Sequence, residues 1–125
     1  MKINDKLIPK PKILYLNNNG SNGNITLNDD VSNYNYLEIF YTDNNKTMRN
    51  SVKVWDFNGK DINLYFFLNY KNDSGIFNYI YCKKVTASGN KLTKKLETYM
   101  QIKNTTINQV YEADYIYITK VLGYK

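Results

Sequence analysis

Apolar and polar residues alternate in short segments along most of this chain, and the alternation constrains its fold more than any other feature. In residues 34–41, for example, Leu37, Ile39 and Tyr41 share one parity, and a more polar set shares the other. A period of two residues is the pattern of a β-strand that buries one face. No segment shows a convincing helical period. The chain is therefore predicted to be all-β.

Turn signals divide the chain into short predicted strands. Asn58-Gly59 and Ser88-Gly89-Asn90 have the composition of tight hairpin turns, and the cluster from Asn17 to Gly23 predicts a turn after the first strand. A helix competes only for residues 92–100, where β-branched and aromatic residues favour a strand. The predicted strands are residues 12–16, 25–27, 34–41, 51–55, 62–68, 76–85, 92–102 and 115–122.

The spacing of these strands predicts the fold class. Turn signals about every 8–12 residues are typical of an antiparallel β-sandwich, here jelly-roll-like with about eight or nine short strands. Residues 76–85 are apolar or aromatic on both faces, which indicates a central strand or one that borders another subunit. Pro9-Lys10-Pro11 cannot join the middle of a ladder. Residues 1–11 are therefore predicted to be an extended attachment arm, and residues 12–125 a single domain.

The residue types argue against catalysis. The 125 residues include no histidine and only 11 acidic residues, so the commonest general base is absent. Cys82 is the only cysteine, which excludes an intrachain disulfide, and it is expected to be a small buried hydrophobe. We expect no enzyme activity and no cofactor. Four carboxylates carry no motif and are interpreted as solvated strand-edge residues: Glu38, Glu97, Glu112 and Asp114.

Two acidic segments offer oxygen ligands of the kind that calcium prefers, namely Asp29-Asp30 and Asp43-Asn44-Asn45. The same residues are typical of Asx turns, in which the side chain accepts a hydrogen bond from the backbone a few residues on. The turn interpretation is favoured, and no metal site is predicted.

The net charge of +6 raises the question of a nucleic-acid partner. The positive charge comes almost wholly from scattered lysines, and Arg49 is the only arginine. Arginine is the usual residue for bidentate contacts to phosphate or guanine, so a basic nucleic-acid-binding β-barrel is kept only as an alternative. The charged residues 1–7 are unlike a secretory signal, and no apolar run approaches a membrane span. A protein made in the cytosol, without membrane insertion, is expected.

Aromatic residues are the candidates for contacts with a partner. The chain has 13 Tyr, 5 Phe and 1 Trp, and several fall on the strand face opposite the predicted core. Such side chains stack on sugar rings or nucleobases, or are buried against another layer or another chain. The candidate oligomer interface is Tyr36, Phe40, Trp55, Tyr65 and Phe67. The candidate ligand contacts, near predicted loops, are Tyr34, Asn69 and Tyr70.

Five segments carry a resemblance to a known family: residues 12–15, 20–27, 36–44, 51–54 and 115–125. The most specific is the ending Tyr-Ile-Tyr-Ile-Thr-Lys-Val-Leu-Gly-Tyr-Lys. Together they resemble the distal domain of tail-fibre and minor structural proteins of phages that infect Gram-positive bacteria. The resemblance covers residues 11–125 and implies a virion-associated β-sandwich, usually trimeric, at or near the host-recognition end of a fibre. In that family the domain usually ends a much longer polypeptide, whereas here it follows only a short arm.

The leading functional hypothesis follows from this resemblance. It is a fibre- or tail-associated structural protein of the virion, a homotrimer that contacts host cell-wall polysaccharide or other surface glycans. In this hypothesis residues 1–11 attach the chain to other virion proteins, and lysis releases the particle from the host cytoplasm. The first alternative is a capsid decoration or fibre-junction protein with a purely structural role, and the second is the nucleic-acid-binding β-barrel.

Overall fold

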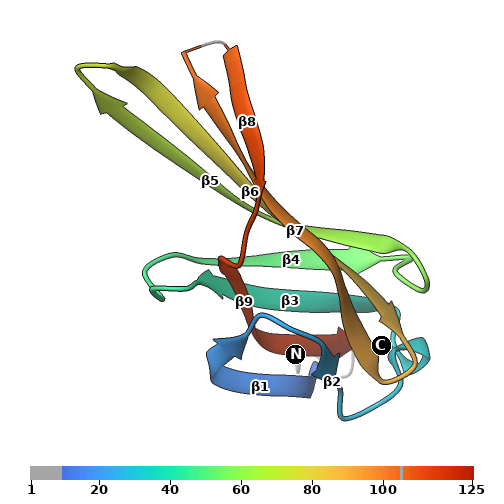
Figure 1. Ribbon diagram of the computed structural model, residues 1–125. Helices are drawn as coiled ribbons and strands as arrows, with labels where there is room; N and C mark the ends of the chain where they lie inside the picture. Colours follow the sequence, from blue (N-terminus) through green and yellow to red (C-terminus); the bar gives the residue numbers. More distant parts are fainter. Residues whose placement is uncertain (1–9, 105) are drawn as a thin grey trace, which may run out of the picture.

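The computed structural model describes residues 10–104 and 106–125, which form two antiparallel β-sheets packed face to face (Figure 1). The predicted all-β sandwich is confirmed. Within the described residues the only helix is a single 3-10 turn at Val31–Asn33. The predicted attachment arm, residues 1–11, lies outside the described residues except for Lys10 and Pro11, which are exposed.

Each sheet has four strand positions. Sheet A has the strand order β1 (Lys12–Ser21), β9 (Ile116–Tyr124), β3 (Tyr36–Asp43) and β4 (Arg49–Trp55). Sheet B has the order β2 (Ile25–Thr26), β7 (Lys91–Lys103), β6 (Gly75–Ser88) and β5 (Asp61–Asn72), and β8 (Thr106–Glu112) also pairs with β7. β2 pairs with the beginning of β7 and β8 with its end. β5 to β8 thus form an up-and-down meander.

The inner faces of the two sheets form the core. The alternation in residues 34–41 is confirmed, since Leu37, Ile39 and Tyr41 are at most 3% exposed. Sheet B contributes the matching face of β5, with Ile62 and Leu64 buried. The remaining buried apolar residues complete this cluster: Leu14, Ile25, Leu27, Val31, Tyr34, Phe57, Phe66, Val85, Ala87, Leu92, Ile116, Ile118 and Val121.

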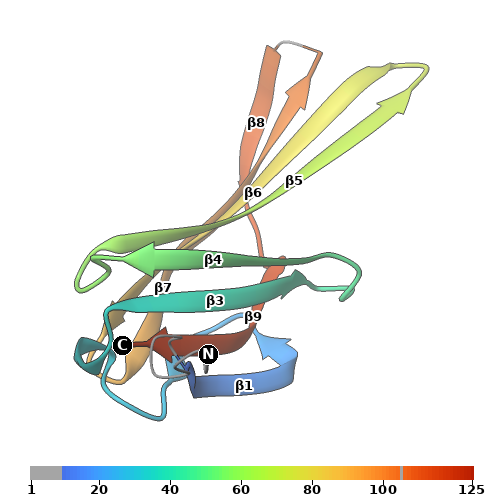
Figure 2. The same cartoon turned by 180° about the vertical axis from the view of Figure 1, so that it is seen from behind.

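Sheet B is longer than sheet A, and its far half leaves the sandwich. In both views β5 to β8 curl away from β3 and β4 and end in two hairpin tips that stand clear of the rest (Figures 1 and 2). We call residues 67–82, 98–104 and 106–112 the projecting sheet. None of its residues whose side chains are described is buried. Within residues 10–104 and 106–125, this half of sheet B therefore has no second layer.

Two strands differ from the sequence prediction. β1 continues through the Asn-rich cluster that was expected to be a turn, and it pairs with β9 as far as Ser21 by means of register shifts. Gly20 makes this possible, because its φ is +80° and a Cβ there would lie 2.7 Å from the Cβ of Tyr117. β8 was not predicted at all. The predicted central strand, in contrast, is confirmed as β6 between β5 and β7.

A buried ion pair joins the two sheets. Lys83 on β6 and Glu97 on β7 face each other with side chains 0% exposed and Nζ 3.4 Å from Oε1. Lys83 also donates to the carbonyl oxygens of Asn22 and Ile116, and Glu97 accepts from the backbone N–H groups of Tyr115 and Ile116. The prediction of a solvated strand-edge position is therefore wrong for Glu97. Burial lowers the pKa of Lys83.

Candidate interaction surfaces

Three aromatic rings form a ladder across the outer face of sheet A. In the strand register Tyr36 lies opposite Trp55 on one side and Tyr124 on the other. The ring centroids of Tyr36 and Trp55 are 4.6 Å apart, and those of Tyr36 and Tyr124 are 4.5 Å apart with nearly parallel planes. We call Trp55, Tyr36 and Tyr124 the aromatic ladder. Trp55 is 58% exposed because β4 is the edge strand of the sheet.

The ladder offers one open aromatic face beside polar groups. Both faces of the Tyr36 ring are covered by its neighbours, whereas the Trp55 ring has a neighbour on one side only. The hydroxyl of Tyr124 donates to Glu38 Oε1 at 2.9 Å, and Glu38 lies opposite Lys53 in the register. Burial, followed by the hydrogen bond to Glu38, raises the pKa of Tyr124, so its hydroxyl stays protonated near neutral pH.

The other members of the predicted interface lie elsewhere. Phe40 shares the outer face of sheet A with the ladder, but the Nζ of Lys120 lies 4.4 Å above its ring. Tyr65 and Phe67 are on β5 in sheet B, where their rings stack at 5.9 Å. The structure therefore brings Tyr36 and Trp55 together and separates them from the pair on β5.

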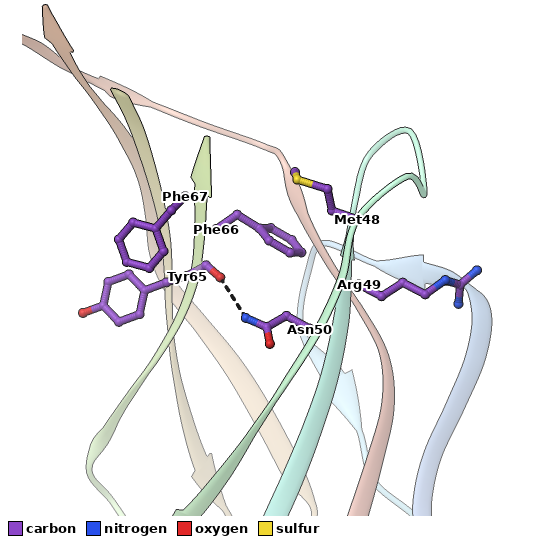
Figure 3. A pocket seen from close by; sticks show the side chains of 6 residues that line it. All are labelled: Met48, Arg49, Asn50, Tyr65, Phe66 and Phe67. Atoms are coloured by element: carbon purple, nitrogen blue, oxygen red, sulfur yellow. Dashed lines mark hydrogen bonds between the residues drawn. The ribbon is translucent and has the colours of Figure 1, made fainter. Parts of the chain in front are cut away.

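A groove of about 390 Å³ lies between the edge strands β4 and β5 (Figure 3). Its lining residues are Met48, Arg49, Asn50, Tyr65, Phe66 and Phe67. Figure 3 shows the rings of Tyr65 and Phe67 side by side on one face of β5, whereas Phe66 points toward β4. Behind the groove the hydroxyl of Tyr41 donates to the carbonyl oxygen of Tyr65 and accepts from its N–H, at 3.0 and 3.1 Å. This hydroxyl fixes the edge of sheet B to sheet A.

The outer face of the projecting sheet carries a row of apolar side chains. Phe67 lies opposite Ile80, Ile80 opposite Met100, and Met100 opposite Val110. We call these four residues the outer row. Phe67 is 69% and Val110 54% exposed. Of the outer row only Phe67 could be predicted from the sequence, because the row depends on the register of four strands, which no local sequence pattern indicates.

The three predicted ligand contacts do not form one site. Tyr34 is buried, and its hydroxyl donates to Asp29 Oδ2 at 2.8 Å; burial, followed by this hydrogen bond, raises its pKa to about 12. Asn69 and Tyr70 lie on the projecting sheet but on opposite faces of β5. The side-chain amide of Asn69 donates to Asn78, and Tyr70 packs against Phe77 with centroids 6.2 Å apart.

The acidic segments behave as turn-forming residues. Asp30 accepts from the backbone N–H of Ser32, and Asp43 accepts from the backbone N–H groups of Thr47 and Met48. Across residues 10–104 and 106–125, no group of three or more histidine, cysteine or acidic residues is placed to hold a metal ion. Cys82 is half-buried, and burial raises the pKa of its thiol, which disfavours the reactive thiolate.

Two further findings bear on the role of the chain. In the part of the chain that the structure describes, no helix has the length and apolar character needed to cross a membrane. Comparison of the sequence with protein-family models and with curated proteins gives no match.

Proposed function

We propose that this chain is a structural protein of a bacteriophage virion, associated with the tail or a fibre, and that its sandwich contacts glycans of the host surface. The sequence resemblance described above supports this role, and so does the sandwich fold. The single observation that carries the glycan contact is the exposed ring of Trp55 at the edge of sheet A.

The aromatic ladder has the properties of a sugar-stacking site. One face of a pyranose ring presents C–H groups, which pack on the flat face of an indole and remove apolar surface from water. Tyr36 and Tyr124 stack behind Trp55, so the indole is already ordered and little side-chain entropy is lost when a sugar binds. Glu38 and Lys53 provide hydrogen-bonding groups on the same face, where sugar hydroxyls need partners.

The binding test compares Trp55→Ala with Leu16→Ala. Leu16 is 57% exposed on β1, the opposite edge strand of the same sheet, so the control removes an apolar side chain of similar fractional exposure. Titration with cell-wall polysaccharide from a Gram-positive host should give saturable binding for the wild type. Trp55→Ala should weaken it at least about tenfold, as for a central aromatic contact, and Leu16→Ala should leave it unchanged. Equal affinities for all three proteins would remove the ladder as the glycan site.

A purely structural role, in capsid decoration or a fibre junction, is the second candidate. The projecting sheet favours it, because uncovered apolar strands are typical of contacts between protein subunits. This role predicts no saturable binding of the wild type to host cells or polysaccharide. Binding to oligonucleotides that weakens steeply with salt would instead support the nucleic-acid alternative.

A further inference from the structure

We propose that the outer face of the projecting sheet is a self-association surface, occupied by the same face of a second copy of this chain. The inference rests on the structural role proposed above, and because each copy contributes the same face it predicts pairs of chains, which differs from the trimer that the family resemblance implies. It assigns to that role a surface that contains Phe67 but none of the aromatic ladder.

The surface has an apolar centre with polar residues on both of its borders. The outer row runs straight across four paired strands, and neighbouring strands are about 4.8 Å apart. Asn69 and Asn78, hydrogen-bonded to each other at 2.9 Å, border the row toward the hairpin tips. Ile102, opposite Asn78, extends the apolar strip on that side, and Tyr65, Cys82, Thr98 and Glu112 border the row toward the sandwich. An apolar strip with a polar rim is the usual anatomy of a protein interface.

A groove next to the outer row makes the surface complementary in shape to the same surface on a second copy. The groove has a volume of about 320 Å³ and lies over the paired strands β5, β6 and β7. Its lining residues are Phe67, Leu68, Asn69, Asn78, Tyr79, Ile80 and Ile102. Phe67, at 69% the most exposed large apolar side chain among the described residues, forms one wall. A protruding ring beside a groove is what two identical faces need, because each can place its Phe67 in the groove of the other.

The charge distribution favours a second copy over a charged partner. Within the projecting sheet Lys71 and Lys103 are balanced by Asp73 and Glu112, so the excess of six positive charges belongs to the rest of the chain. Two copies can therefore bring this surface together without like-charge repulsion. A nucleic acid or another polyanion would gain no attraction from it.

The size of the surface predicts a weak contact. Four strands of about seven residues make a face of roughly 20 by 23 Å at standard strand dimensions. This is about 450 Å² for each copy, little more than half of the roughly 800 Å² of a standard interface. Association should therefore depend on concentration in the purified protein and be strengthened where copies are held side by side in a particle.

The test uses two variants in the outer row and one matched control. Phe67→Lys and Val110→Lys each place a charge in the row from a different strand, and both residues are exposed, so neither change removes core packing. Tyr70→Lys places the same charge on the opposite face of β5, at a side chain 54% exposed. Sedimentation of the wild type should show an oligomer that forms with rising concentration. The two row variants should weaken it at least about tenfold, and Tyr70→Lys should not.

Cys82 gives a second readout within the native chain. It lies two positions along β6 from Ile80, on the same face and opposite Tyr65 and Thr98. Alkylation of its thiol by a maleimide should slow as the wild-type concentration rises, whereas the rate for Phe67→Lys should not change. A thiol that reacts at one rate across the wild-type association curve would place the contact elsewhere and overturn the proposal.

Other outcomes also overturn the inference. If the wild type stays monomeric at its highest soluble concentration, the proposed contact does not form. If only Tyr70→Lys dissociates the oligomer, the contact is on the inner face of the projecting sheet. These results leave the glycan test untouched, since Trp55 is on sheet A. Conversely, loss of polysaccharide binding with the concentration-dependent oligomer intact would remove the glycan contact and leave the self-association surface.

Discussion

The ring of Tyr34 occupies the space above Gly123 in β9, and the two residues show how closely the end of the sandwich is packed. A Cβ on Gly123 would lie 2.6 Å from the nearest atom of the Tyr34 ring. That ring cannot move aside freely, because it is buried and its hydroxyl is held by Asp29. A position that the sequence offered as a ligand contact is thus in a close-packed part of the structure.

Gly123→Ala is expected to destabilise the fold by about 1–3 kcal/mol, because the added methyl group must displace a fixed ring. Urea unfolding measures the change in the free energy of unfolding. Gly23→Ala is the matched control, since a Cβ at Gly23 meets nothing within 4 Å, and its effect should be small. If the two variants were equally stable, the ring of Tyr34 would have to be less constrained than its contacts indicate.

The candidate surfaces could be predicted from the sequence only in part, as individual residues show. Parity along β3 and β4 placed Tyr36 and Trp55 on the outer face, but only the register places them opposite each other. The separation of Phe67 from Trp55 was not predictable, because it depends on which strands share a sheet. Lys83 and Glu97 were not identified either, since charged residues on a strand ordinarily face solvent.

Among the elements, the β3–β4 hairpin depends on one carboxylate. Asp43 is buried and accepts hydrogen bonds from Thr47 and Met48 within the turn. Lys46 has a φ of 59° in the same turn. Burial alone would raise the pKa of Asp43, but the hydrogen bonds from Met48 and Thr47 outweigh it and hold the pKa below its ordinary value of 3.8.

This lowered pKa fixes the sign of a pH dependence. A carboxylate with a lower pKa in the folded state contributes stability above its ordinary pKa and loses it as the pH falls through the folded pKa. Asp43→Asn should therefore cost about 1–2 kcal/mol at pH 7, and its difference from the wild type should shrink below pH 3.8. Urea unfolding across this range measures both. Asp73→Asn, in an exposed turn, is the control and should change little at any pH.

Most strands were predictable because one face of each is buried. Apolar and polar residues alternate along such a strand, and this alternation is visible in the sequence. β8 was missed because its two aliphatic residues, Ile107 and Val110, are three positions apart and so do not alternate with a period of two. The strand is held by pairing with β7. The length of β1 was not predictable, because the Asn-rich residues 17–23 favour a turn and predict that the strand ends at residue 16. Pairing with β9 outweighs that local preference.

At the scale of the whole molecule, the Lys83–Glu97 pair connects the root of the projecting sheet to the opposite sheet. Through Ile116 both side chains reach β9 in sheet A. Each charge depends on the other, because neither has access to water. The extension of sheet B beyond the sandwich was not predictable from the sequence, because it depends on which strands share a sheet and on the unequal lengths of the two sheets.

Lys83→Met is expected to cost about 3–5 kcal/mol, because it leaves the carboxylate of Glu97 buried without a cation. Lys60→Met is the control. Lys60 also pairs with an acid, Asp56, but both side chains are more than half exposed, and such pairs contribute little. Chemical unfolding of the two variants separates the cases. A cost for Lys83→Met no larger than that of Lys60→Met would mean that water reaches the pair.

The position of β9 between β1 and β3 also determines the order in which the molecule can be assembled. β9 follows every other strand that the structure describes, so β1 lacks its partner, and β3 one of its two partners, until β9 has been synthesised. β5 to β8 instead pair with their sequence neighbours through short turns, and such local contacts form quickly. A nascent chain would therefore present the apolar meander before the sheet beneath it is complete, when it is most exposed to aggregation and to chaperones.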